Sequence, residues 1–319
     1  MSISARYHNE LHGILRDLYK ILCMSLGEVL KADKSGMSIM GKLRGFIALI
    51  RPLNCVLMGV AVIVGASLSS TLSLSISLLL GCLTSFTLTG ASMAINDYYD
   101  LEIDRINEPK RPIPSGAVSP KEAVAFALVL SLVGFIAALG TNLACFVVSI
   151  IAWILFVTYT TKGKQTGLPG NLLVSACVVT PLIYGSLVRG DPPNRLTIIY
   201  IVMAFLSNTG REVAKGIVDV EGDRSRDVKT IAVLYGERNA AVVSAVLVFL
   251  AVGVTAFPWL WQLTSVWFVP LIVVTDGGLM LSSLSLLRDY SRRNARRVKT
   301  LFMGWFTTGL IGFLAGTVG

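Results

Sequence analysis

The sequence predicts an all-α, polytopic membrane protein with nine transmembrane helices. Of its 319 residues, 54% are hydrophobic and only 15% are charged, and the mean hydropathy is +0.70. Soluble domains usually contain about 25% charged residues. The apolar residues gather in stretches of the length that crosses a bilayer, roughly 20 residues. Such stretches favour helices over the strands of about ten alternating residues that build a membrane barrel.

The nine predicted spans are distributed along the whole chain after a polar leader. They cover residues 46–69, 76–97, 121–140, 143–160, 168–188, 196–217, 237–257, 264–287 and 299–318.

The basic residues predict how these spans are oriented. If nine helices alternate, 26 of the 28 Lys and Arg residues fall on one side, and only Arg189 and Arg195 fall on the other. Positive charge collects on cytoplasmic loops. We therefore expect a multi-pass protein of the cell membrane whose N-terminus and longest charged loops are cytoplasmic. The net charge of +9 then reflects topology and contact with membrane lipids, and it does not indicate nucleic-acid binding.

Residues 1–43 are expected to form an amphipathic or flexible cytoplasmic extension, and residues 44–319 to form the nine-helix domain. Leu11, Ile14, Leu15, Leu18 and Leu22 recur at helical spacing, with charged residues between them. This pattern is typical of a helix that lies on a membrane surface. An extension that serves only packing, or one that is disordered, is the alternative.

Two acidic motifs share one spacing. "NDYYDLEID" places Asn96, Asp100 and Asp104 four residues apart, and "DVEGDRSRD" does the same with Asp219, Asp223 and Asp227. Residues at i and i+4 are neighbours on a helix surface. Each motif therefore predicts a narrow polar stripe, and both stripes follow spans that end on the predicted cytoplasmic side.

A bound cation explains why these acids are placed where they are. Carboxylates near helix C-termini are opposed by the helix dipole and by one another. Mg²⁺ relieves both effects, since it binds a few carboxylates and completes its shell with water and phosphate oxygens. Two solvated acidic helix ends are the simpler alternative.

Basic residues adjoin both motifs and point to a phosphorylated ligand. Lys110 and Arg111 follow the first motif, Lys229 follows the second, and Tyr159 and Lys162 end the fourth predicted span. Acids alone would indicate a cation transporter. Acids together with Lys and Arg indicate a diphosphate that is bridged by metal and bound by cations.

The two motifs resemble the NDxxDxxxD and DxxxDxxxD motifs of the UbiA superfamily of intramembrane prenyltransferases. The resemblance covers about residues 44–319, and it implies a nine-helix bundle around a central cavity. "RPLNC" (51–55), "KRPIPSG" (110–116), "REVAKGIVDVEGD" (211–223) and "KTIAVLYG" (229–236) are most similar to the archaeal lipid-synthesising branch. Gly216 departs from the pattern, because relatives often carry a further aspartate there.

This resemblance implies a Mg²⁺-dependent prenyltransferase. The substrates would be a prenyl diphosphate and a lipid-like acceptor: geranylgeranyl diphosphate donates its chain to the free hydroxyl of geranylgeranylglyceryl phosphate, through an allylic cation. An aromatic acceptor such as 4-hydroxybenzoate is the alternative within the family. No obligatory protein partner is indicated.

The resemblance also implies roles for individual residues. Asn96, Asp100 and Asp104 would form one metal site, and Asp219, Asp223 and Asp227 the other. Asp100 and Asp223 would be essential to catalysis, and Asp97 could take the acceptor's proton. The predicted substrate contacts are Arg51, Asn54, Lys110, Arg111, Tyr159, Lys162 and Lys229.

Asp276 is an acid in the middle of a predicted span, in "VVTDGGLM". Intramembrane acids are functional candidates by default. A hydrogen bond to a neighbouring helix is the equal alternative, and we do not add Asp276 to the site.

Overall fold

A computed structural model of the chain describes residues 39–69, 74–225 and 227–317. The predicted amphipathic leader lies almost wholly outside the described residues, so the division between residues 43 and 44 stays a prediction. Every regular element in the described ranges is a helix, which confirms the all-α prediction. In chain order the elements are α2 (Ile39–Ile50), α3 (Pro52–Ser69), α4 (Ile76–Tyr99), α5 (Leu101–Asn107), α6 (Pro120–Thr141), α7 (Leu143–Thr161), the 3₁₀ helix η1 (Gly163–Thr166), α8 (Leu168–Leu187), α9 (Arg195–Ser225), α10 (Ile231–Tyr235), α11 (Glu237–Val254), α12 (Ala256–Leu260), α13 (Phe268–Arg288) and α14 (Arg292–Gly316).

Most of the predicted spans coincide with one long helix each. In the described part of the chain, eight helices are long and apolar enough to cross a membrane. The sixth predicted span coincides with α9, which is not among these eight: it has 31 residues, and its second half carries the charged sequence of the second motif. The nine-helix count therefore holds if α9 crosses the membrane with its apolar first half.

The first predicted span begins inside α2 and continues through α3. The helix is interrupted at Arg51, whose φ is +50° and which precedes Pro52. Proline disfavours helical geometry in the residue before it and cannot donate a backbone hydrogen bond. The hydropathy pattern is continuous across this break, so it did not reveal it.

Capping side chains fix where several helices begin. Asn142 accepts a hydrogen bond from the backbone N of Cys145 at the start of α7. Before α6, Ser119 and Glu122 exchange bonds in a capping box: the Ser119 backbone N donates to Glu122 Oε2, and the Glu122 backbone N donates to Ser119 Oγ. Lys42 adds an ion pair to Glu122 at 3.0 Å.

The chain divides into two compact units. Of the described residues, the first comprises 39–56 and 86–134, and the second comprises 57–69, 74–85, 135–225 and 227–317. Within the first unit, small residues let α4 and α6 approach α2 and the loop before α6. Its buried core contains Leu49, Ala91, Ala94, Ile113, Val118, Ala123 and Ala127.

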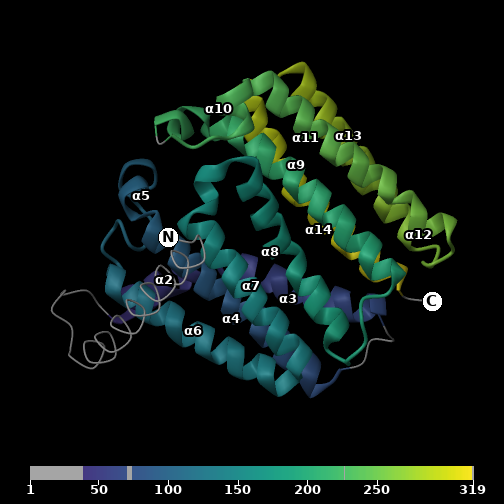
Figure 1. The fold of residues 1–319 in the computed structure, drawn as a ribbon, viewed down its shortest axis with the longest axis horizontal. Helices are drawn as coiled ribbons and strands as arrows, with labels where there is room; N and C mark the ends of the chain where they lie inside the picture. The colour runs from purple at the N-terminus through teal and green to yellow at the C-terminus, as the bar shows by residue number, and fades with distance from the viewer. Residues whose placement is uncertain (1–38, 70–73, 226, 318–319) are drawn as a thin grey trace, which may run out of the picture. The chain divides into compact units, whose positions relative to one another are not determined.

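The second unit is a helical bundle in which α9, α11, α13 and α14 pack side by side (Figure 1). α8 packs on both α7 and α9. Two glycines allow α8 and the second-unit part of α3 to touch through their backbones. A Cβ on Gly65 would lie 2.2 Å from the Leu182 carbonyl O, and one on Gly185 would lie 2.1 Å from that of Val62. Such small-residue contacts are typical of packed membrane helices.

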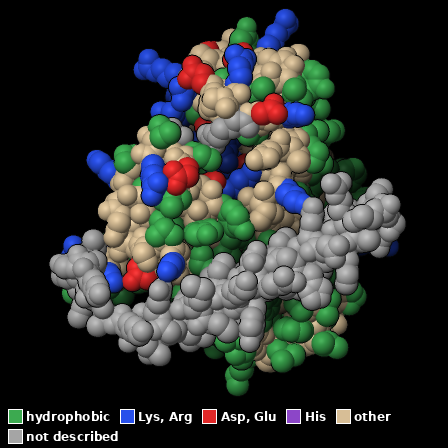
Figure 2. Space-filling model, turned by 60° about the vertical axis from the view of Figure 1, so that its left-hand side comes forward, with side chains coloured by type: hydrophobic (Ala, Val, Ile, Leu, Met, Phe, Trp, Pro, Cys, Tyr) green, Lys and Arg blue, Asp and Glu red, His purple; other side chains and the backbone are tan. Residues whose placement is uncertain are grey.

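Large apolar side chains reach the surface on the spanning helices. On α6, Leu132 and Ile136 are more than half exposed, as is Leu143 on α7. Hydrophobic side chains are visible in many places on the face shown in Figure 2. This exposure fits helices whose outer faces contact lipid.

Candidate active site

The first motif keeps its predicted i, i+4 register although it crosses a helix junction. Asn96 lies near the end of α4, Asp104 lies on α5, and Asp100 stands between the two helices. Helical hydrogen bonds run through the junction, from Asp100 N to Asn96 O at 3.0 Å and from Asp104 N to Asp100 O at 2.8 Å. The Asn96 amide Nδ2 donates to Asp100 Oδ2 at 2.9 Å. Asn96 and Asp100 therefore present oxygen-bearing side chains next to each other.

Two arginines bind the carboxylates of this motif. Arg51 Nη2 lies 2.6 Å from Asp97 Oδ1, and Arg111 Nη1 lies 3.6 Å from the same oxygen. Arg111 Nη1 also donates to Asp104 Oδ2. We call Arg51, Asp97, Arg111 and Asp104 the arginine–aspartate chain. It links the α2–α3 break, the end of α4, α5 and the loop after α5.

The two carboxylates of the arginine–aspartate chain are largely removed from water. Asp97 is 2% exposed and Asp104 is 4% exposed. Burial raises the pKa of Asp104 above its usual range, although Arg111 opposes the shift. For Arg111, burial favours the neutral form, but Asp104 and Asp97 outweigh this effect and raise the pKa of its guanidinium. Arg111 therefore stays charged wherever Asp104 is ionised.

The second motif departs from the expected helical stripe. Asp219 and Asp223 lie on α9, but the helix ends at Ser225, so Asp227 lies beyond it. The backbone N of Val228 bonds the Asp223 carbonyl O at 2.9 Å and closes the turn. Asp227 has φ +54°, a left-handed conformation that few residues other than glycine adopt. The third aspartate is therefore positioned by a turn and not by helical periodicity.

The predicted substrate-binding residues of the second unit lie on two segments that contact each other. Tyr159 is on the last turn of α7, and Lys162 follows it at the start of the loop that contains η1. The backbone N of Lys229 donates to the Gln165 carbonyl O at 3.2 Å, which joins this loop to the segment after the second motif. Gly167 permits the contact: its φ is +70°, and a Cβ there would lie 1.8 Å from the Lys229 carbonyl O.

The remaining predicted contacts belong to the first unit. Lys110 is exposed in the loop after α5, and Asn54 is half-buried on the first turn of α3. The Asn54 backbone N donates to the Arg51 carbonyl O at 2.9 Å, so the turn of α3 continues back to Arg51. Arg51 and Asn54 are therefore held by the same turn.

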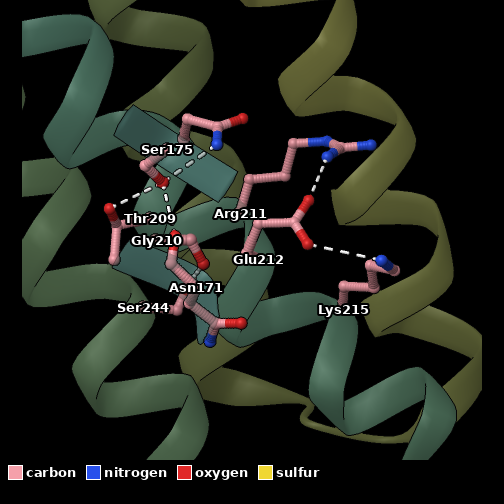
Figure 3. A network of polar contacts seen from close by, with 9 residues as sticks. Asn171, Ser175, Thr209, Gly210, Arg211, Glu212, Lys215 and Ser244 are labelled. Carbon is pink, nitrogen blue, oxygen red and sulfur yellow. Dashed lines mark hydrogen bonds and ion pairs between the residues drawn. The ribbon is translucent and has the colours of Figure 1, made fainter. Parts of the chain in front are cut away.

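Sequence reasoning missed a charged cluster on α9, shown in Figure 3. Arg211 Nη1 lies 2.6 Å from Glu212 Oε1, and Lys215 Nζ lies 3.3 Å from Glu212 Oε2. Glu212 is 9% exposed. Lys215 also interacts electrostatically with Asp219 and Tyr159. The signal was present in the sequence, since Arg211 and Lys215 continue the four-residue spacing of Asp219 and Asp223 toward the N-terminus.

Neutral hydrogen bonds hold α9 beside this cluster. Ser175 Oγ on α8 accepts from Asn208 Nδ2 at 3.0 Å and bonds Thr209 Oγ1 at 2.9 Å. From α11, Ser244 Oγ donates to the Gly210 carbonyl O at 2.7 Å. These bonds, drawn in Figure 3, fix the position of α9 immediately before its cationic turn.

The described residues contain no group of three His, Cys, Asp or Glu side chains close enough to hold a metal ion. In the first motif, Asn96 and Asp100 present one adjacent pair of side chains with oxygen ligands. The assignment of Asn96, Asp100, Asp104, Asp219, Asp223 and Asp227 to metal binding therefore stays a prediction, as do the predicted catalytic and substrate-binding roles.

The sequence pattern of the UbiA prenyltransferase family matches residues 57–307. The chain belongs to this family. A digeranylgeranylglyceryl phosphate synthase of Korarchaeum cryptofilum (strain OPF8) is 36% identical over 276 residues, which are 86% of this chain and 98% of that protein. The synthase of the same name from Pyrococcus furiosus is 34% identical over 87% of this chain and 98% of its own length.

Solved UbiA-type structures share the fold. A chain described as a digeranylgeranylglyceryl phosphate synthase in membranes has a TM-score of 0.73 and 27% identity, covering 87% of this chain and 99% of that one. A UbiA homolog from Archaeoglobus fulgidus, solved with GPP and Mg²⁺, has a TM-score of 0.62 and 19% identity over 85% of this chain and 99% of that one. The predicted family, its archaeal branch and the UbiA fold are confirmed, and this UbiA family member is a multi-pass membrane protein.

Proposed function

We propose that this UbiA family prenyltransferase transfers a geranylgeranyl group from geranylgeranyl diphosphate to the free hydroxyl of geranylgeranylglyceryl phosphate. The observation that carries the proposal is the 36% identity, over nearly the whole of a curated relative, to a digeranylgeranylglyceryl phosphate synthase. The two aspartate motifs and their adjoining cations support the same chemistry. The reaction forms a C–O bond at C1 of the prenyl chain and releases diphosphate and a proton.

Mg²⁺ fits the ligands that the two motifs offer. Carboxylate and amide oxygens are the donors that this hard cation prefers, and it keeps several positions for water and substrate phosphate. The Asn96–Asp100 pair, with 2.9 Å between Nδ2 and Oδ2, offers two such groups. Asp219 and Asp223 offer two more on α9. When bound, the metal withdraws charge from the diphosphate oxygens and makes diphosphate a better leaving group.

The chain's own cations bind and orient the donor. Lys162 and Lys229 lie on two segments that are joined by a backbone hydrogen bond. Tyr159 lies on the last turn of α7, just before Lys162. Lys215, which is paired with Glu212 at 3.3 Å, adds a further cation one turn before Asp219 on α9. In the first unit, Arg51 and Arg111 are fixed in place by Asp97.

The contacts of Asp97 favour a positioning role over the role of a proton acceptor. Its carboxylate is 2% exposed and is bound by two guanidinium groups. Its Oδ1 is already engaged by Arg51 at 2.6 Å and by Arg111 at 3.6 Å. An alcohol that attacks an allylic cation needs little activation, so water can receive the proton.

The excess of Lys and Arg on one side supports a site that faces the cytoplasm. With the site on that side, both phosphorylated substrates would reach it from the same leaflet of the membrane. Labelling of a single cysteine in the loop after α5 by a membrane-impermeant reagent, in intact cells and in lysed cells, tests this orientation. Labelling in intact cells would contradict it.

An acceptor comparison tests the proposed activity. Purified full-length protein is incubated with geranylgeranyl diphosphate, Mg²⁺ and either geranylgeranylglyceryl phosphate or 4-hydroxybenzoate, and the prenylated product is identified by mass spectrometry. We expect product only with the glyceryl phosphate. Product only with 4-hydroxybenzoate, or no diphosphate release with any acceptor, would overturn the proposal.

A further inference from the structure

The second unit carries an open groove in which Lys229 is the only lining residue with a role assigned above. Its volume is about 500 Å³, and it lies between the start of α8, the short helix α10 and the start of α11. This volume falls within the range of pockets that hold small molecules. All of its lining residues belong to the second unit.

The groove is amphipathic. Leu168, Leu234 and Val242 supply apolar walls, while Lys229, Thr166 and Asn239 supply polar groups. Leu234 is 53% exposed and Tyr235 beside it is 67% exposed, so α10 presents apolar surface that no other element of the described ranges covers. Exposed apolar surface edged by polar groups marks a binding site.

The helices around the groove place it at the surface of the membrane. α8 and α11 are both long and apolar enough to span a bilayer, and the groove lies at the first turns of each. An occupant must therefore be an amphiphile with an anionic head and an apolar chain. The Lys229 side chain is exposed and suits a phosphate head.

The groove adjoins the second aspartate motif. Lys229 follows Asp227 by two residues, and the turn between them is closed by the bond from Val228 N to Asp223 O at 2.9 Å. The loop that contains η1 also lines the groove. The backbone N of Lys229 donates to the Gln165 carbonyl O of this loop at 3.2 Å. A phosphate held by Lys229 would therefore lie beside the residues assigned above to the donor's metal site.

We propose that this groove binds the acceptor lipid, with its phosphate on Lys229 and its isoprenoid chain along Leu168, Leu234 and Val242. This inference rests on the proposed function for the identity of the lipid. It reassigns Lys229 from the donor diphosphate to the acceptor phosphate.

A groove-filling variant with a matched control tests the inference. Val242→Trp places a large ring in the groove, while Val246→Trp adds the same ring one turn further along α11, at an exposed residue that does not line the groove. The KM for each substrate is measured in nanodiscs of zwitterionic lipid. We expect Val242→Trp to raise the acceptor KM about tenfold, because the ring occupies space that the isoprenoid chain needs, and to leave the donor KM unchanged. Val246→Trp should change neither value.

Lys229→Gln distinguishes the two possible assignments of this residue. A rise of about tenfold in the acceptor KM supports the groove. A rise confined to the donor KM returns Lys229 to the diphosphate and overturns the inference. If Val242→Trp fails to fold, Leu234→Gln replaces it, because Leu234 is exposed on α10. An unchanged acceptor KM in both folded variants also overturns the inference.

A direct binding measurement separates this inference from the proposed function. Radiolabelled geranylgeranylglyceryl phosphate is bound to the full-length protein without the donor, in discs with and without phosphatidylglycerol. Binding that Val242→Trp weakens, and that phosphatidylglycerol does not displace, supports the groove even if no transfer occurs. Equal displacement by phosphatidylglycerol would make it a general anionic-lipid site and would contradict the inference.

Discussion

Asp97→Asn tests the arginine–aspartate chain most sharply. The substitution keeps the size of the side chain and removes the charge that Arg51 contacts at 2.6 Å and Arg111 at 3.6 Å. Breaking a fully buried ion pair costs about 3–5 kcal/mol, because the remaining charge is left unpaired. The Arg51 and Arg111 side chains are 35% and 31% exposed, so water recovers part of this loss. We therefore expect the free energy of unfolding to fall by about 2–3 kcal/mol.

The assay is unfolding by SDS titration in mixed micelles, followed by circular dichroism. The matched control is Glu122→Gln, which removes the charge paired with Lys42 at 3.0 Å, where both side chains are about 30% exposed or less. Here the amide oxygen of the variant can still cap α6, so we expect a loss under about 1 kcal/mol. Equal losses of stability in the two variants would refute a stabilising role for the buried Asp97 carboxylate. Loss of turnover in Asp97→Asn without any loss of stability would also refute it and would favour the role of a base.

Three further predictions concern the second motif, the η1 loop and the first motif. Asp223→Asn should lower kcat by about 10²–10³-fold in a diphosphate-release assay while the far-UV circular dichroism is unchanged, and a near-normal rate would remove Asp223 from the site. Gly167→Ala should destabilise the protein far more than Gly236→Ala in thermal unfolding, because both glycines have positive φ but only at Gly167 would a Cβ meet backbone, at 1.8 Å; equal losses would contradict the packing described here. Burial raises the pKa of Asp104, so the folded protein holds this proton more tightly than the unfolded chain. The resulting stability is present below pH 3.8 and is lost as the pH rises through the raised pKa of Asp104 in the folded protein. Asp104→Asn should flatten this part of the stability–pH curve.

Hydropathy and helical spacing predicted the helix bounds and the helical register, because both depend on residues that are close together in the sequence. The spans from 121–140 and 143–160 agree with α6 and α7 to within one residue at each end. The i, i+4 spacing of Asn96, Asp100 and Asp104 also predicted a continuous helical register, and the backbone bonds keep it through the α4–α5 junction.

Contacts between distant segments could not be predicted in this way. Arg51 and Asp97 are 46 residues apart, and the left-handed φ of Arg51 leaves no mark in the hydropathy pattern. Lys229 and Gln165 meet through backbone atoms, which carry no sequence signal beyond a glycine at position 167. The position of Asp227 past the end of α9 likewise follows from a turn that the spacing alone did not indicate.

Gly216 shows how a departure from the family pattern fits the packing. It is buried on α9, and a Cβ there would lie 3.5 Å from Thr230 Cβ, which is an ordinary contact. Alanine therefore fits at this position. A larger polar side chain would have to share this space with the segment that carries Lys229.

The most direct test of the account is metal-dependent transfer to the lipid acceptor. Radiolabelled geranylgeranyl diphosphate and geranylgeranylglyceryl phosphate are incubated with the wild-type protein in the presence of Mg²⁺ or of EDTA, and the label in the lipid product is counted. We predict transfer of label with Mg²⁺, its loss in EDTA and its recovery when Mg²⁺ is restored. Transfer at an equal rate in EDTA, or no label in the lipid under any condition, would contradict the assignment of the two aspartate motifs to a metal-assisted prenyl transfer.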